Sequence, residues 1–254
     1  MVRTVDYQSR KRAVLAAAIN KYTKEATPVA SEDIAKEFGL SSATIRNIFA
    51  DLEEDGYLKH PYTSGGRVPT AQGYRYYVDF LMSELPDYSL DREMLDADKD
   101  FITREYHREI RRMEDVLERT SEIVSALTHY TSVVSILDWQ DKFFYRGVGF
   151  ILEQPEFQDV ARIRFLIKMM EDKQRLLNII NREFAEKVKI YIGDELGCRE
   201  INNCALAVST YRIKNRLSGR LAVLGPMRMK YSHIVSTLEY ISDVLGQTLE
   251  EAFE

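Results

Sequence analysis

Apolar residues recur every three or four positions in residues 7–23, a pattern that is typical of an amphipathic helix. Pro28 ends this pattern, because a proline disfavours the helical conformation of the residue before it. A short second helix is predicted for residues 31–38, with Ser31 as its N-cap and Gly39 at its C-terminal end. The chain is therefore expected to begin with two helices separated by a sharp break.

A third helix is predicted to start at Ser41 or Ser42, because either serine can cap it and apolar residues follow at helical spacing. Two helices joined by a short turn form a helix-turn-helix, whose second helix presents its N-terminal residues to the major groove of DNA. The outward residues of this helix are Thr44, Arg46 and Asn47. Hydroxyls and amides at a helix N-terminus bind phosphate, and arginine and asparagine can hydrogen-bond to guanine and adenine. We predict that these five residues contact DNA; the alternative is an ordinary capped surface helix.

A hairpin is predicted next, because residues 57–60 suit a short strand, a turn follows, and Pro69 stops the returning strand. Thr70 is then the expected N-cap of a fourth helix. Three helices, this wing and the fourth helix make up a winged helix-turn-helix domain, which we assign to residues 1–86.

The wing and the start of the fourth helix are poor in acidic residues, so their polar and basic residues can approach the DNA backbone. These candidates are Lys59, Thr63, Ser64, Gly65, Gly66, Arg67 and Arg75. The alternative is a solvated hairpin, and Arg75 can instead pair with Asp51 or Asp79. Tyr74 has the spacing of a core residue, which argues against a base-stacking role.

Residues 87–104 are acidic and weakly periodic, which predicts a linker. In residues 106–127 the spacing between apolar residues alternates between four and three positions. This heptad pattern predicts a long helix with one apolar stripe, here called the seam. The seam residues are candidates for dimerisation: Tyr106, Ile110, Met113, Leu117 and Val124. Such a seam can pack on the protein's own sheet or pair across a two-fold axis, and the pattern fits both.

Beyond residue 132, short β-type runs alternate with helical segments. The predicted strands are residues 133–137, 143–152, 187–192, 204–213 and 220–224, and the predicted helices are residues 159–184 and 231–253. The last two strands flank a turn and are expected to form an antiparallel hairpin. The predicted fold class is therefore α+β, with a second domain over residues 105–254.

The composition of the 254 residues is that of a globular protein, with 45% apolar and 30% charged residues. The longest uninterrupted apolar run has seven residues, whereas a transmembrane helix needs about 20. The net charge of −5 argues against nonspecific coating of DNA by the whole surface. Cys198 and Cys204 have neither zinc-site nor disulfide spacing, so we interpret them as packing residues of a cytoplasmic protein.

The chain lacks the short motifs of nucleophile-elbow hydrolases, metalloproteases, P-loop enzymes and dinucleotide-binding enzymes. Its four histidines share no metal-ligand spacing. We therefore predict that the protein is not an enzyme, and we assign no catalytic residue, no metal site and no cofactor.

Three sequence blocks point to one family: SSATIRNIFADLEEDGYL at residues 41–58, PYTSGGRVPTAQGYRYYVD at residues 61–79, and LAVLGPMRMKYSHI at residues 221–234. Through them the chain resembles the HrcA family of heat-inducible transcription repressors. Weaker similarity runs through LEQPEFQDV at residues 152–160 and through two shorter blocks. The resemblance implies a dimer with an N-terminal winged helix and a C-terminal GAF-like domain. Family members usually carry a longer central segment with a dimerisation module, where this chain has only residues 138–151.

The first functional hypothesis is a sequence-specific repressor of heat-shock and chaperone genes that binds an inverted-repeat operator as a homodimer. Dependence on a chaperonin is implied by the resemblance alone. The alternative is a transcription regulator whose GAF-like domain senses a small molecule. A deep polar pocket among the strands would favour ligand sensing, whereas a filled apolar core would favour thermal control.

Overall fold

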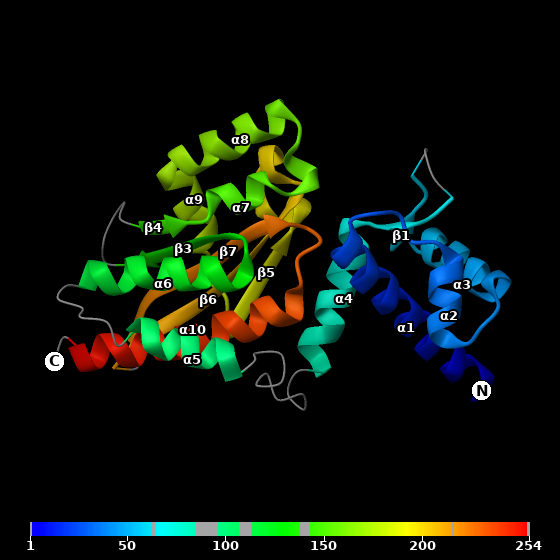
Figure 1. Ribbon diagram of the computed structural model, residues 1–254, viewed down its shortest axis with the longest axis horizontal. Coiled ribbons are helices and arrows are strands. Elements are labelled where there is room, and N and C mark those ends of the chain that lie inside the picture. Colours follow the sequence, from blue (N-terminus) through cyan, green and yellow to red (C-terminus); the bar gives the residue numbers. More distant parts are fainter. Residues whose placement is uncertain are drawn as a thin grey trace. The chain divides into compact units, whose positions relative to one another are not determined.

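The computed structural model describes residues 2–61, 65–84, 96–106, 113–137, 143–214 and 216–252. The chain divides into two compact units, Met1–Asp87 and Tyr88–Glu254, which are described separately (Figure 1). Of the helices in the described ranges, none combines the length and the apolar character that crossing a bilayer requires.

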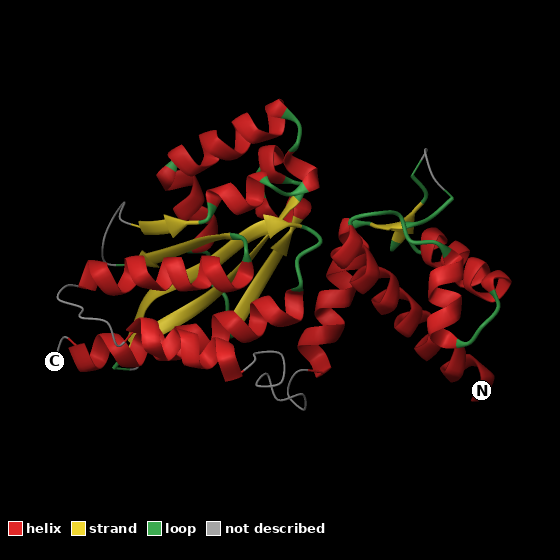
Figure 2. Cartoon of the chain, in the orientation of Figure 1, coloured by secondary structure: helices red, strands yellow, loops and turns green. Residues whose placement is uncertain are grey.

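The described residues of the first unit form four helices and a small antiparallel hairpin (Figure 2). The elements are α1 (Val2–Glu25), α2 (Ser31–Phe38), α3 (Ser42–Glu54), β1 (Leu58–Lys59), β2 (Val68–Pro69) and α4 (Ala71–Glu84). Apolar faces of the helices form its core, in which Ile19, Ile34 and Ile45 are fully buried. Helices with one apolar face are stable only when that face is covered, so the three predicted helices fold onto one another. The predicted winged helix-turn-helix is confirmed.

Side-chain caps fix the starts of two helices in this unit. Ser41 precedes α3, and its hydroxyl accepts a hydrogen bond from the Thr44 amide at 3.1 Å. The hydroxyl of Thr70 accepts a bond from the Gly73 amide at 3.0 Å at the start of α4. The Ser31 cap was predicted wrongly, because Ser31 is the first residue of α2 and Ala30 precedes it without a side-chain bond.

The second unit has an α+β fold. Its strands are β3 (Thr131–Ile136), β4 (Phe143–Arg146), β5 (Val188–Ile192), β6 (Cys204–Ile213) and β7 (Arg216–Pro226). Its α-helices are α5 (Asp96–Tyr106), α6 (Met113–Thr128), α7 (Val148–Leu152), α8 (Val160–Glu171), α9 (Lys173–Ile180) and α10 (Tyr231–Ala252), with short 3-10 helices at Pro155–Phe157, Gly193–Leu196 and Arg199–Ile201. The predicted α+β class is confirmed.

The five strands form one antiparallel sheet in the order β4-β3-β7-β6-β5. Helices α6 and α10 contact one face, and α7, α8 and α9 lie on the other side (Figure 1). Between the sheet and α7–α9 there is a filled apolar core, to which Phe157, Leu166, Leu176, Leu206 and Leu224 contribute. This is the helix-covered antiparallel sheet that the GAF-like prediction requires.

A buried ion pair joins two of the family-like sequence blocks. Arg228, from the block at residues 221–234, places Nε 2.6 Å from a carboxylate oxygen of Glu156 and donates through Nη2 to Gln154 at 2.7 Å. Both partners belong to the block at residues 152–160. The turn after β7 is thereby fixed to the segment that precedes α8.

Three predicted elements of the second unit are wrong in their bounds. The predicted strand 220–224 is longer, because β7 begins at Arg216 and ends at Pro226. The predicted strand 143–152 ends at Arg146, because Gly147 adopts a left-handed conformation (φ 81°) and α7 follows it. The predicted helix 159–184 is divided into α8 and α9, and Asp172 caps the second through the Arg175 amide.

The predicted continuous helix over residues 106–127 is also wrong. The Tyr106 hydroxyl lies 2.6 Å from the Thr120 hydroxyl, whereas 14 residues of one helix would extend about 21 Å. Helix α5 therefore folds back on α6. The predicted linker of residues 87–104 overlaps α5, in which Ile102 is completely buried.

The dimerisation role predicted for the seam stays a prediction, and three of its five residues have little exposed surface in the described chain. Leu117 and Val124 are fully buried within the chain and Tyr106 is 8% exposed, so they have almost no surface to offer a partner. Met113 is partly exposed, and Ile110 lies outside the described residues. Of the two arrangements open from the pattern, the seam packs on the protein's own sheet, where α6 contacts β3.

Candidate nucleic-acid interface

The N-terminus of α3 exposes a cluster of hydroxyl groups. Ser41 is exposed and Ser42 and Thr44 are partly exposed, and the hydroxyls of Ser41 and Thr44 lie 2.9 Å apart. The cap bond to the Thr44 amide orients the Ser41 hydroxyl against the first turn. Amides and hydroxyls gathered at the positive end of a helix dipole form a site for an anionic oxygen, such as that of a DNA phosphate.

The next turn of α3 presents Arg46 and Asn47 to solvent, while Ile45 and Ile48 on the opposite face are buried. Arg46 donates from Nε to the Ser42 carbonyl at 3.3 Å. This bond uses one of the five N–H donors of the guanidinium and directs the side chain along the helix. The remaining N–H groups of the guanidinium can donate hydrogen bonds to O6 and N7 of a guanine.

One carboxylate of α3 contacts both sides of the wing. Glu53 Oε2 lies 2.8 Å from Arg67 Nε, and Glu53 Oε1 accepts a hydrogen bond from the His60 amide at 3.1 Å. His60 follows β1 and Arg67 precedes β2, so Glu53 joins both sides of the hairpin to α3. This side chain therefore contributes to the position of the wing relative to α3.

Arg67 is more enclosed than the sequence suggested, because its side chain is 19% exposed and paired with Glu53. Its backbone also exchanges two hydrogen bonds with Val29, at 2.8 and 2.9 Å. Gly66 sits against Pro28, where an added Cβ would lie only 2.8 Å from a backbone atom. The base of the wing is thus built into the segment before α2.

The remaining predicted contacts differ in their surroundings. Lys59 and Gly65 are exposed, whereas Thr63 and Ser64 lie outside the described residues. Arg75 pairs with Asp79 at 3.4 Å, which is one of the two alternatives that the sequence left open. Tyr74 is 1% exposed, so it belongs to the core as expected from its spacing.

Helix α1 contacts α3 and its C-terminal end through polar side chains, and the sequence analysis missed these contacts. The Tyr7 hydroxyl donates to Asp51, and Lys11 lies 2.7 Å from Asp55. The hydrogen bond to Asp51, together with burial, raises the pKa of Tyr7 to about 12. The acidic residues at intervals of four on α3 were the available signal, but the partner helix was not predictable from them.

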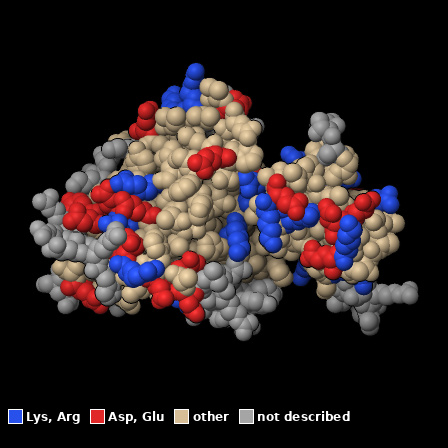
Figure 3. Space-filling model, viewed as in Figure 1, with Lys and Arg blue, Asp and Glu red and all other residues tan. Residues whose placement is uncertain are grey.

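Basic and acidic side chains are mixed on the face of the N-terminal unit that Figure 3 shows. A mixed surface does not attract DNA by one broad positive field. The face shown therefore offers individually placed charges and no broad positive field.

Two matches to one family cover most of the chain. Residues 6–79 match the family described as "Winged helix-turn-helix transcription repressor, HrcA DNA-binding". Residues 135–235 match "HrcA protein C terminal domain". The matched segments contain α3 and the wing in the first unit, and strands β4 to β7 in the second.

Curated relatives and one solved structure agree with these matches. A heat-inducible transcription repressor HrcA of Pelotomaculum thermopropionicum is 29% identical, with 95% of this chain and 96% of the relative aligned. One of Desulforudis audaxviator is also 29% identical, over 96% of this chain and 98% of the relative. A crystal structure described as a hypothetical protein has a TM-score of 0.76 at 17% identity, covering 96% of this chain and 98% of that one, and so shares the fold.

The relatives carry residues that this chain lacks. The alignment to the Pelotomaculum protein extends over 342 positions, whereas this chain has 254 residues. At least 88 positions of that alignment are therefore without a counterpart here. The family resemblance predicted a shortening, which it placed in the central segment.

Proposed function

Because this chain belongs to the HrcA family of winged-helix transcription repressors, we propose that it binds an inverted-repeat operator as a homodimer and represses heat-shock and chaperone genes. The observation that carries the proposal is the exposed N-terminal turn of α3, with Arg46 and Asn47, beside a wing that Glu53 joins to α3. A bound dimer competes with RNA polymerase for the promoter, so repression is by occlusion.

Each part of the unit has a separate task in this mechanism. Arg46 and Asn47 read base edges in the major groove, and the serines at the start of α3 hold a phosphate. Lys59 and the wing contact the backbone beside the groove, which adds affinity that depends on salt. Two recognition helices about 34 Å apart then read two half-sites on one face of the DNA.

A dimer requires a surface other than the buried seam. The second unit exposes large apolar side chains at Tyr145 on the edge strand β4 and at Val160 and Ile167 on α8. Val160 is 70% exposed and Ile167 is 41% exposed, and both lie on the outer side of one helix. We propose that this side of α8 forms the subunit contact in place of the family's central module.

Heat lowers operator occupancy in this proposal, because the second unit or its dimer contact opens reversibly as temperature rises. A chaperonin is the proposed partner that returns the opened protein to its binding form, as the family resemblance implies. The protein acts on DNA in the cytoplasm and carries out no catalysis.

A transcription assay tests the proposal directly. Purified protein is added to a chaperone-operon promoter of the source genome either before or after RNA polymerase, and single-round transcripts are measured. Occlusion predicts strong repression when the protein is added first and little when polymerase is already bound. Equal transcript yields in both orders, at protein concentrations that saturate the promoter, would contradict it.

Two observations bear on the alternative of small-molecule sensing, and they point in opposite directions. The face of the sheet under α7–α9 is filled with apolar side chains, which favours thermal control. A polar pocket nevertheless exists on the α10 side of the same unit. This pocket contains none of the proposed DNA-binding residues.

A further inference from the structure

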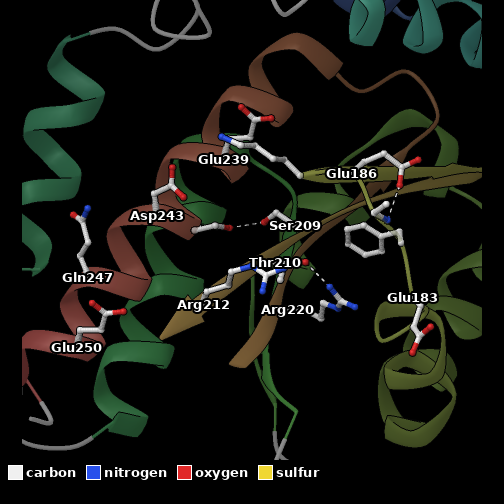
Figure 4. Close-up of a pocket in the computed structure, with 14 residues that line it drawn as sticks. Glu183, Glu186, Ser209, Thr210, Arg212, Arg220, Glu239, Asp243, Gln247 and Glu250 are labelled. Atoms are coloured by element: carbon white, nitrogen blue, oxygen red, sulfur yellow. Dashed lines mark hydrogen bonds between the residues drawn. The ribbon is translucent and has the colours of Figure 1, made fainter. Parts of the chain in front are cut away.

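A polar pocket of about 890 Å³ lies between the end of the sheet and α10 (Figure 4). It exists because the β5–β6 ladder begins where Val188 faces Ser209, while β6 continues to Ile213. The segment of residues 183–187 therefore passes beside β6 without pairing to it and forms one wall. A cavity of this volume is within the usual range for small-molecule sites.

The floor of the pocket contains a buried guanidinium. Arg220 is 4% exposed, its Nη1 donates to the Thr210 hydroxyl, and the ring of Phe184 lies 4.5 Å from its Cζ. Its Nη2 donates to the Arg182 carbonyl at 3.4 Å. Among the described residues, no carboxylate forms an ion pair with this guanidinium, and its buried Nε has no acceptor.

A buried cation without an ion-pair partner is costly, because hydrogen bonds to neutral groups and a ring contact replace only part of its hydration. Burial accordingly lowers the pKa of Arg220. The three contacts to neutral groups orient the side chain without neutralising its charge. An anionic group bound in the pocket would supply the missing partner, and a carboxylate matches the guanidinium in shape.

The opposite wall is acidic. Helix α10 contributes Glu239, Asp243 and Glu250, which Figure 4 shows in a row along the helix together with Gln247. Burial raises the pKa of Glu239, because its charged form is poorly hydrated there. Lys187, also in the lining, offsets part of the charge of Glu239, so Asp243 is the acid of this wall that chiefly attracts an ammonium group.

We propose that the pocket binds a small zwitterion, with its carboxylate toward Arg220 and its ammonium group toward Glu239 and Asp243. The hydroxyls of Ser209 and Ser242, which lie 2.6 Å apart in the pocket, supply further polar contacts. The proposal concerns the second unit alone and does not depend on the DNA-binding residues.

A matched series of probes tests both charges at once. Binding to the full chain is measured by calorimetry for glycine, β-alanine, 4-aminobutyrate, 5-aminopentanoate and 6-aminohexanoate. The controls for each length are the alkyl carboxylate and the alkylammonium ion that lack the second charge. We expect at least one amino acid of the series to bind at least about tenfold more tightly than both of its controls.

Two outcomes would overturn the proposal. The first is no binding by any member of the series up to about 10 mM. The second is equal binding by the alkyl carboxylate, which would leave an anion site and no zwitterion site. Repression assays with the unliganded protein are unaffected by either outcome, so failure here is distinguishable from failure of the proposed function.

Variants locate the site. Arg220→Gln should abolish binding of the best probe, and circular dichroism shows whether that variant folds. Asp243→Asn provides a second test that does not risk the core, because Asp243 is exposed, and it should weaken binding at least fivefold. Asp194→Asn is the matched control, since Asp194 is an exposed acid of the same unit outside the pocket. Equal weakening by Asp243→Asn and Asp194→Asn would show that the ammonium group does not reach α10.

Discussion

Glu53 on the recognition helix α3 and Arg67 at the base of the wing form an ion pair, with Oε2 and Nε 2.8 Å apart. The same carboxylate also accepts the His60 amide. The pair links α3 to the wing within the domain, together with the backbone bonds between Arg67 and Val29.

The pair should make a measurable contribution to folding. A double-mutant cycle with Glu53→Gln and Arg67→Ala, followed by urea unfolding, is expected to give a coupling free energy of about 0.5–1 kcal/mol, because the two side chains are only partly exposed. The exposed pair Lys21–Glu25 on α1 is the control and should give less. A coupling energy for Glu53 and Arg67 that is indistinguishable from zero would show that the wing is held by other contacts.

Arg46→Ala should reduce operator affinity by about 1–3 kcal/mol and flatten base preference at one position of each half-site, because a base-reading guanidinium is removed. Folding should be unchanged, since Arg46 is exposed and makes only a local bond to Ser42. Lys24→Ala, which removes an exposed charge at the end of α1, is the control. Unchanged sequence preference in Arg46→Ala would remove this residue from the contact set.

Salt dependence should distinguish the two cations of the wing. Lys59 is exposed, so Lys59→Ala should lower the slope of log affinity against log salt by about 0.9, as expected for one lost phosphate contact. Arg67 is paired with Glu53, so Arg67→Ala should change the slope less and reduce stability more. Titrations at several salt concentrations measure both slopes. A larger change in slope for Arg67→Ala than for Lys59→Ala would mean that Arg67 exchanges its ion pair with Glu53 for a DNA phosphate on binding.

The contact between Tyr7 and Asp51 predicts a change in stability at high pH. The pKa of Tyr7 in the folded protein is about 12, above its ordinary value of 10.0, because the neutral phenol donates to Asp51. Its stabilising contribution is therefore complete below pH 10 and is lost as the pH rises from about 10 to about 12. The difference in free energy of unfolding between wild type and Tyr7→Phe should shrink over this interval. A constant difference would contradict the assignment.

The subunit contact proposed for α8 is tested by the pair of changes Val160→Glu and Ile167→Glu. Both side chains are exposed, so the variant should fold normally but have a monomer's mass in light scattering at about 100 μM. Leu117→Ala, in the buried seam, should instead cost about 2–5 kcal/mol of stability and leave folded molecules dimeric. A dimeric mass for the α8 variant would place the contact elsewhere.

The sequence predicted the elements whose signals are local. Helix α3, the wing and α4 carry their own caps, glycines and apolar spacing, so Ser41, Thr70 and Tyr74 were assigned correctly. The Ser31 cap was wrong because a serine can equally occupy the first helical position, and the choice depends on how the preceding strand-like segment pairs with the wing.

Long-range relationships were not readable from the pattern. A heptad pattern indicates which side chains are buried but not which element covers them, so the packing of α5 against α6 was not predicted. Glu53 looked like an ordinary surface acid of an amphipathic helix, and only the fold brings it to Arg67. The pocket beside Arg220 arises from the offset between β5 and β6, which depends on strand register.

In the proposed function, α3 and the wing of a dimer read an inverted repeat before chaperone genes. Selection of genomic DNA fragments by the purified protein, sequenced for wild type and for Arg46→Ala side by side, tests this recognition. We predict that wild type enriches fragments upstream of chaperone operons, that these share an inverted repeat with half-sites on one face of the helix, and that Arg46→Ala loses the enrichment. Enrichment of fragments without a shared repeat, or an identical profile for both proteins, would contradict the claim.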